Sequence, residues 1–254
     1  MSDEVLVESR DGVTVVTINR PRARNAVNGA VSAAMAAAFE EFEARKDVSV
    51  AIVTGAGGTF CSGMDLKAFL AGEDVLHPER GLAGITRRPP RKPVIAAVEG
   101  YALAGGCEVV LACDLVVAAE NAKFGIPEVK RGLVAGAGGL LRLPHRIPRA
   151  VAMELALTGD FLDAAEAKAH GLVNKVTEAG GALAGAWELA ARIAANGPLA
   201  VAATKEILVG SLDWTEEEGW SRQDGIMQPV FASADAREGA TAFAEKRPPV
   251  WRGE

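Results

Sequence analysis

Cysteines and aromatic residues are scarce in this sequence of 254 residues. The three cysteines, Cys61, Cys107 and Cys113, include no Cys-x-x-Cys pair, which argues against a disulfide framework and against a zinc site. Aromatic residues make up only 5% of the chain, and alanine and glycine fill the space instead. A core of small residues indicates closely packed helices and segments where the backbone approaches another group closely.

Strong positive charge and long apolar segments are also lacking. Lysine and arginine number 27 against 33 acidic residues, giving a formal net charge of -6, so the basic face needed for non-specific nucleic-acid binding is not expected. No apolar run reaches the length of a membrane span, and the acidic start does not resemble a secretory signal. His77, His145 and His170 show no metal-ligand spacing. We therefore expect a cytoplasmic protein without a metal, a nucleic-acid partner or membrane insertion.

Strand and helix patterns alternate along the first half of the chain. Asp11-Gly12, between β-branched runs, predicts a hairpin, and Asn28 is typical of the N-cap of a helix over 30–46. Apolar strands are predicted at 48–54, 94–98 and 115–118, and the proline- and arginine-rich residues 73–93 are interpreted as a mobile surface loop. Helices are predicted at 137–143, 149–156, 163–169, 181–196, 198–210, 215–231 and 235–245. This order predicts an α/β fold with a covered parallel sheet and a helical extension.

Two glycine turns follow predicted strands and begin helices. The first is Phe60-Cys-Ser-Gly-Met-Asp-Leu66, and the second is Gly100-Tyr-Ala-Leu-Ala-Gly-Gly-Cys-Glu-Val110. Two such turns after neighbouring strands bring two backbone N–H groups to one point, which is the geometry of an oxyanion hole. The structural alternatives are that Asp65 is an ordinary N-cap and that Gly105 and Gly106 serve tight packing.

Two glutamates lie in apolar surroundings near these turns. Glu108 is in the first turn of an apolar helix, and Glu128 follows Pro127. Burial raises the pKa of a carboxyl group, so a convergent pair suits general acid–base catalysis. The alternatives are compensation of the helix dipole by Glu108 and an exposed turn carboxylate at Glu128. Cys107 lacks a His or Asn partner, so packing is the better interpretation of this residue than nucleophilic catalysis.

With these segments assembled, the chain resembles the crotonase superfamily, the enoyl-CoA hydratase/isomerase family. The matching segments keep the family's order: Asn19-Arg-Pro21 with Asn25-Ala26, Phe60–Asp65, Gly100–Glu108, Phe124-Gly-Ile-Pro-Glu128, Gly136-Ala-Gly-Gly139, Leu157-Thr-Gly-Asp160, Ala167–Val173 and Phe243-Ala-Glu-Lys-Arg247. The resemblance implies an α/β, crotonase-like ββα spiral core over 1–198 that holds an acyl-CoA site. It also implies a C-terminal helical trimerisation region over 199–254, in a homotrimer or a dimer of trimers.

The resemblance also assigns roles to residues. The backbone amides of Met64 and Gly105 would form the oxyanion hole, and Glu108 and Glu128 would hold the water. The remaining substrate-binding residues are Ala23, Arg24, Ser62, Asp65, Leu66, Pro127, Gly136 and Lys246. For Lys246, the alternative is that a neighbouring subunit supplies it. No cofactor is expected, because coenzyme A enters as part of the substrate.

The expected activity is reversible hydration of a 2-enoyl-CoA, a lyase reaction. Alternatives within this chemistry are a Δ3,Δ2-enoyl-CoA isomerase and another hydroxyacyl-CoA dehydratase. A non-catalytic acyl-CoA-binding protein and a thioester hydrolase are alternatives of other classes. Three departures from the family's pattern bear on the acyl pocket: Met64, where hydratases often have alanine, the basic run Val129-Lys-Arg131, and residues 73–93.

Overall fold

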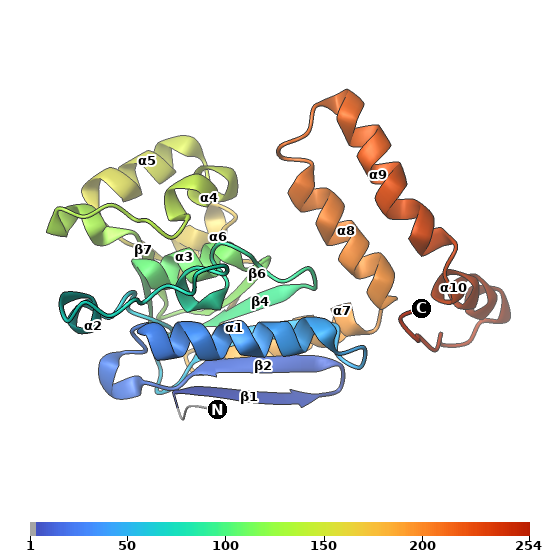
Figure 1. Cartoon of the computed structure of the whole chain (residues 1–254), viewed down its shortest axis with the longest axis horizontal. Coiled ribbons are helices and arrows are strands. Elements are labelled where there is room, and N and C mark those ends of the chain that lie inside the picture. Colours follow the sequence, from blue (N-terminus) through green and yellow to red (C-terminus); the bar gives the residue numbers. More distant parts are fainter. Residues whose placement is uncertain (1–3) are drawn as a thin grey trace.

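A computed structural model describes residues 4–254; residues 1–3, the start of the expected first domain, lie outside the described part. The main sheet has six strands in the order β1-β2-β3-β4-β6-β9, and a second sheet has the order β5-β7-β8 (Figure 1). Of the strand pairs within residues 4–254, β1–β2 and β7–β8 are antiparallel and the other five are parallel. The strands are β1 (Val5–Arg10), β2 (Val13–Ile18), β3 (Val50–Gly55), β4 (Val94–Val98), β5 (Tyr101–Leu103), β6 (Leu115–Ala119), β7 (Lys123–Gly125), β8 (Leu162–Asp163) and β9 (Lys175–Thr177).

Ten α-helices and three 3-10 helices surround these sheets among the described residues. The α-helices are α1 (Gly29–Ala44), α2 (Leu66–Leu70), α3 (Gly105–Ala112), α4 (Gly139–Arg146), α5 (Arg149–Thr158), α6 (Ala164–Ala169), α7 (Ala182–Ala194), α8 (Pro198–Gly210), α9 (Glu216–Phe231) and α10 (Ala234–Glu245). The 3-10 helices are η1 (Pro21–Ala23), η2 (Leu82–Gly84) and η3 (Pro127–Arg131). The predicted α/β class and helix order are confirmed.

The central strands of the main sheet, β2, β3, β4 and β6, are buried on both faces, which explains their nearly continuous apolar sequence. Alternate residues point to opposite faces, so in β3 Val50 and Ile52 join one apolar cluster and Ala51 and Val53 join the other. The first cluster is completed by small residues of α7, and the second by α1 and α3. The alanines of α7 let that helix lie close to the sheet, whereas α1 packs through larger side chains, including Phe39 and Phe42.

The small sheet makes the chain a spiral of repeated turns. A long strand of the main sheet, β4 or β6, is followed by a short strand of the small sheet, β5 or β7, and then by a helix. The turn after β3 follows the same path, because Cys61 makes an isolated parallel bridge with Ala102 of β5. The expected crotonase-like spiral is thus confirmed. The short strands β5, β7, β8 and β9 were not predicted, because two or three residues carry too little pattern.

Local signals gave the correct hairpin and helix starts. Asp11 and Gly12 both have positive φ, 49° and 77°, as the tight turn between β1 and β2 requires. The Asn28 side chain accepts a hydrogen bond from the amide of Val31 at 2.9 Å and caps α1.

The interpretation of residues 73–93 as a surface loop is wrong for their middle part. Leu82 and Ile85 are buried in the core beside α1. The Arg80 side chain is fully buried, and its guanidinium pairs with Glu43 of α1 at 2.6 Å and donates to the carbonyl of Arg88. Arginine content indicated exposure, but a charge compensated by an acid on a neighbouring helix can be buried.

The last three helices extend from the core. In Figure 1, α8 and α9 project away from the sheets, and α10 lies on the far side from α2. Lys205 of α8 holds this region to the core through Asp114 at 2.6 Å, and Trp251 donates to the carbonyl of Ala195 at 2.9 Å. The boundary at 198/199 stays a prediction. None of the helices within residues 4–254 is long and apolar enough to cross a membrane.

Candidate active site

Three segments of the expected site meet at one edge of the small sheet. Cys61, Ala102 and Phe124 lie side by side, joined by the bridge between the first two and by the pairing of β5 with β7. Met64 comes three residues after Cys61, and Gly105 comes three residues after Ala102. Because these strands run parallel, the chain leaves all three at the same end, and the glycine turns are brought together as expected.

The amides of Met64 and Gly105 lie beside each other, at the positions predicted for an oxyanion hole. A Cβ atom built on Gly105 would lie 3.3 Å from the nitrogen of Met64, so the two positions are adjacent. Across residues 4–254, neither amide donates a hydrogen bond to another group of the chain, and the bridge beside Met64 instead uses the amides of Val27 and Asp65. Two neighbouring amides without partners are what an oxyanion hole requires.

The turn before Gly105 is strained. Ala104 has φ 52° and ψ −128°, a conformation that L residues rarely adopt. Its amide donates to the carbonyl of Gly125 at 2.9 Å, which holds the strained turn in place. The close fit continues at Gly105, where an added Cβ would lie 2.4 Å from Cδ2 of Leu82. Leu82, in the segment predicted to be a surface loop, therefore packs against the turn Ala104–Gly105, the expected oxyanion turn.

Glu108 is held by the start of α4. Its Oε1 accepts hydrogen bonds from the amides of Ala137 and Gly139, both at 2.8 Å, and its side chain is buried. Burial raises the pKa of this carboxyl group, while the two amides and the charge of Arg142 act in the opposite direction. The sequence did not identify Ala137 and Gly139 as hydrogen-bond partners of Glu108, although the glycine-rich run 136–139 indicated a close approach of the backbone there.

Glu128 has a different environment. It lies in η3, and in the described part of the chain its Oε2 is buried without a hydrogen-bond partner. Burial, followed by the like charge of Glu108, raises the pKa of Glu128 to about 7. The charge of Glu108 thus reaches Glu128. The pair therefore combines a carboxylate held by amides with a carboxyl group ready to carry a proton at neutral pH.

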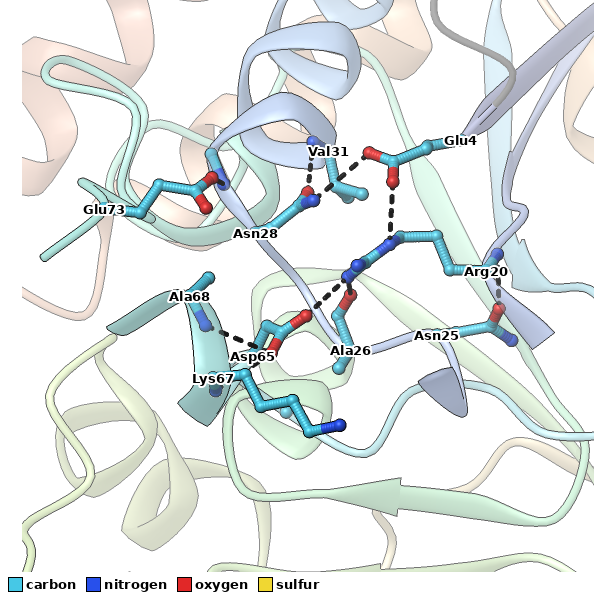
Figure 2. Close-up of polar contacts among 12 residues, drawn as sticks. Glu4, Arg20, Asn25, Ala26, Asn28, Val31, Asp65, Lys67, Ala68 and Glu73 are labelled. Carbon is cyan, nitrogen blue, oxygen red and sulfur yellow. Dashed lines mark hydrogen bonds and ion pairs between the residues drawn. The ribbon is translucent and has the colours of Figure 1, made fainter. Parts of the chain in front are cut away.

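Asp65 is occupied by contacts within the chain (Figure 2). Its Oδ1 caps α2 by accepting from the amides of Lys67 and Ala68, and its Oδ2 pairs with Arg20 at 3.0 Å. Burial acts to raise the pKa of Asp65, but Arg20 and the two amides outweigh it and lower the pKa. Arg20 also pairs with Glu4 at 3.0 Å. Asp65 and Arg20 thus position the turn that carries Met64. The guanidinium of Arg20 is engaged by two carboxylates of the chain, those of Glu4 and Asp65.

Asn25, which belongs to one of the segments that match the family, has a structural role. It is fully buried, its Oδ1 accepts from the amide of Arg20, and its Nδ2 donates to the carbonyls of Ala56 and Thr59. These bonds join the loop after β2 to the glycine turn after β3. Asn25 thus supports the site by holding these two loops together.

The remaining predicted residues are distributed unevenly. Arg24 and Ser62 are brought together by a hydrogen bond from the Ser62 amide to the Arg24 carbonyl at 3.1 Å, and Ala23 precedes them in η1. Three others are close in sequence to residues already described. Leu66 follows Asp65 and begins α2, Pro127 precedes Glu128 and begins η3, and the exposed Gly136 precedes Ala137. Lys246 is the C-cap of α10. Helix α10 lies on the far side of the chain from α2 (Figure 1).

The cysteines and the acidic side chains suggest no other chemistry. Cys61, Cys107 and Cys113 are buried, and burial raises the pKa of each thiol to about 12, so they are inert as nucleophiles. Among residues 4–254, no group of three His, Cys, Asp or Glu side chains is arranged to hold a metal ion.

The spiral fold, the pair of free amides and the pair of glutamates are features of one class of proteins, the crotonase superfamily. The profile of the enoyl-CoA hydratase/isomerase family matches residues 8–254, and the chain belongs to this family.

Three relatives show how close the likeness is. A solved structure of a probable enoyl-CoA hydratase/isomerase from Mycobacterium abscessus is 64% identical, with a TM-score of 0.97 and 100% of both chains covered. An enoyl-CoA hydratase structure from Mycobacterium tuberculosis H37Rv is 60% identical, with a TM-score of 0.98 and the same coverage. The carnitinyl-CoA dehydratase of Proteus mirabilis is 42% identical over 261 residues, again covering 100% of both chains. These names are those of enzymes of the hydratase-like lyase class that the sequence predicted.

Proposed function

We propose that this protein catalyses the reversible hydration of a 2-enoyl-CoA thioester to a 3-hydroxyacyl-CoA. The observation that carries the proposal is the pairing of two free amides, on Met64 and Gly105, with two interacting carboxyl groups, on Glu108 and Glu128. Coenzyme A enters as part of the substrate, and the proposed reaction requires no further cofactor.

The amide pair acts on the thioester oxygen. When water adds to Cβ, the thioester becomes an enolate and negative charge develops on that oxygen. Fixed N–H donors stabilise the charge as it forms, and losing one donor in other enzymes costs on the order of 10²–10³ in rate. Because the turns of Met64 and Gly105 are held by Asp65, Asn25 and Ala104, the donors are positioned before substrate binds.

The different surroundings of the two glutamates suggest different roles. Glu108, with two amides and the positive charge of Arg142, is the better carboxylate and would take a proton from the attacking water. Glu128, with a pKa of about 7, would give a proton to Cα. The hydroxyl bonds to Cβ as the double bond opens, and a proton then passes from Glu108 to Glu128 through the next water. The reverse sequence eliminates water from the 3-hydroxyacyl-CoA.

The name of the Proteus mirabilis relative favours one specific substrate for this reverse direction, carnitinyl-CoA. Its dehydration needs the same two carboxyl groups and the same oxyanion hole. Isomerisation of a 3-enoyl-CoA is less well supported, because one carboxylate is sufficient to shuttle a proton in that reaction. A non-catalytic acyl-CoA binder has no need for two buried carboxyl groups.

An activity comparison tests the proposal. Wild-type protein and the E108Q and E128Q variants are assayed with crotonyl-CoA, carnitinyl-CoA and a 3-enoyl-CoA, with E120Q, which alters an exposed glutamate, as the control. Each site variant should lose on the order of 10²–10⁴ in kcat for hydration, and E120Q should lose nothing. Hydration that survives E108Q contradicts the two-carboxylate mechanism, and turnover of only the 3-enoyl-CoA supports an isomerase.

We also propose that the C-terminal helices assemble the chain into a trimer or a dimer of trimers. Large apolar side chains on α8, α9 and α10 are exposed, including Leu208 at 66%, Trp220 at 65% and Phe243 at 87%. Covering them with other subunits would remove apolar area from water and would give Lys246 a site on a neighbouring chain. Light scattering on the purified protein should give three or six chains per particle, and a monomer would contradict this proposal.

A further inference from the structure

A half-buried arginine links the two halves of the site. Arg142 lies on α4, one turn after Gly139, whose amide binds Glu108. Its Nη2 donates to the carbonyl of Thr86 at 2.7 Å, in the buried segment that includes Leu82. Since Leu82 packs against Gly105, the contact between Arg142 and Thr86 joins the helix that holds the glutamate to the segment that supports the oxyanion turn.

The guanidinium folds back over the start of its own helix. Gly138, the N-cap of α4, has φ 96°, and a Cβ added there would lie 2.4 Å from Nη1 of Arg142. The absence of a side chain at Gly138 therefore creates the place that the guanidinium fills. From there its charge acts on Glu108, whose Oε1 is bound to the same turn of backbone.

We propose that Arg142 is a positioning residue, which supplies the counter-charge of Glu108 and fixes the start of α4 against residues 80–86. The inference deepens the proposed hydration and rests on the role of Glu108 in it. Arg142 touches neither substrate nor reacting atoms in this account. It acts by keeping Glu108 ionised and by holding the amides of Ala137 and Gly139 where that carboxylate needs them.

Few charged or titratable groups face Glu108. Among residues 4–254 these are Glu128 of η3, Arg142 of α4 and Cys107 of α3, a buried thiol with a raised pKa. Arg142 is therefore the cation whose removal changes the electrostatic balance at Glu108. The other titratable groups that act on Arg142 are Arg146, further along α4, and Cys113, the C-cap of α3.

The same helix provides a matched control. Arg146 is also half-buried and also donates to a backbone carbonyl, that of Cys113, at 2.8 Å. Its charge acts on Cys113, Asp114 and Cys107, and Glu108 is influenced by Arg142 instead. The variants R142Q and R146Q thus remove equivalent hydrogen bonds, but only R142Q removes the counter-charge of Glu108. R142K restores the charge without the planar donor group.

The test is a direct titration of Glu108 that does not require turnover. Protein labelled with ¹³C at the glutamate side-chain carboxyl is titrated by NMR, with E108Q identifying the resonance. An opposite charge lowers a carboxyl pKa, so R142Q should raise the pKa of Glu108 by about 1 pH unit. R142K should return most of the change, and R146Q should lower the melting temperature with the Glu108 titration unchanged.

Activity forms the second arm. In R142Q the acidic limb of kcat for crotonyl-CoA should move to higher pH by the same amount, since Glu108 must be ionised to accept the proton of water. An unchanged titration in folded R142Q, or equal changes in R142Q and R146Q, overturns the inference. If wild-type protein hydrates no enoyl-CoA while the titration moves as expected, the proposed function fails and the electrostatic role of Arg142 stands. If R142Q does not fold, folded R142K is titrated in its place: a Glu108 pKa raised by about 1 pH unit, although the positive charge is retained, contradicts a role carried by charge.

Discussion

Replacing Gly105 with alanine tests how closely the oxyanion turn is packed. The backbone of Gly105 is outside the left-handed region, so alanine causes no conformational strain of its own. The added Cβ would lie 2.4 Å from Cδ2 of Leu82 and 3.3 Å from the nitrogen of Met64. Leu82 is only 2% exposed, so its side chain cannot swing into solvent. The turn itself must therefore shift, and the amide of Gly105 shifts with it.

The size of the effect follows from these contacts. Overpacking of this kind costs about 1–3 kcal/mol of stability, which corresponds to a fall in melting temperature of roughly 2–10 °C for a chain of this length. Loss of one oxyanion donor costs on the order of 10²–10³ in kcat. We expect G105A to fold, to keep a KM near that of wild type, and to lose on the order of 10² in kcat, because the donor acts mainly in the transition state.

The assay is hydration of crotonyl-CoA, with thermal unfolding measured on the same samples. G219A is the control, since a Cβ at Gly219 of α9 meets nothing within 4 Å. The double variant L82A/G105A should regain at least part of the lost kcat, because the shorter side chain at Leu82 leaves room for the new methyl group. A folded G105A with kcat within about threefold of wild type would refute the assignment of this amide, given the loss expected from one donor.

Three further predictions concern charge and support. The folded-state pKa of Glu128, about 7, lies above the ordinary 4.5. The contribution of Glu128 to folding stability is therefore fully present below pH 4.5 and is lost as pH rises through 7. Because glutamine does not ionise, E128Q should gain melting temperature relative to wild type as pH rises. N25A should lose about 2–5 kcal/mol in urea unfolding, because it leaves buried backbone groups unpaired. K205M, which strands the carboxylate of Asp114, should lose about 1–3 kcal/mol and speed hydrogen exchange in residues 198–210.

Each of these has an internal check. R22A alters an exposed side chain of the same turn as Asn25 and should unfold like wild type. A melting temperature of E128Q that follows wild type at every pH would mean that Glu128 titrates as an exposed carboxyl group. Unchanged exchange in α8 of K205M would show that other contacts hold this helix to the core.

Features with a local cause were predictable from the sequence. Asp11-Gly12 and Asn28 impose their turn and cap through bonds within four residues, and the structure has both. The short strands β5 and β7 could not be found in this way, since a strand of three residues is defined by its neighbours. The same holds for Arg80, whose burial depends on Glu43, 37 residues away in the chain.

The candidate site shows the same division. The glycine turns and Glu108 were recognisable because glycine at a helix start and a carboxylate in an apolar run are local departures from pattern. The partners of Glu108 lie 29 and 31 residues further along, and the Asn25 bonds to Ala56 and Thr59 span 31 and 34 residues. Such pairings follow from the spiral path of the chain, which composition and periodicity do not specify.

A crystal structure with bound acetoacetyl-CoA tests the central claim most directly. We expect the thioester oxygen at about 2.7–3.1 Å from the nitrogens of both Met64 and Gly105, with the β-carbon between the carboxyl groups of Glu108 and Glu128. A thioester oxygen bound elsewhere, or a β-carbon within reach of only one of the two glutamates, would contradict it.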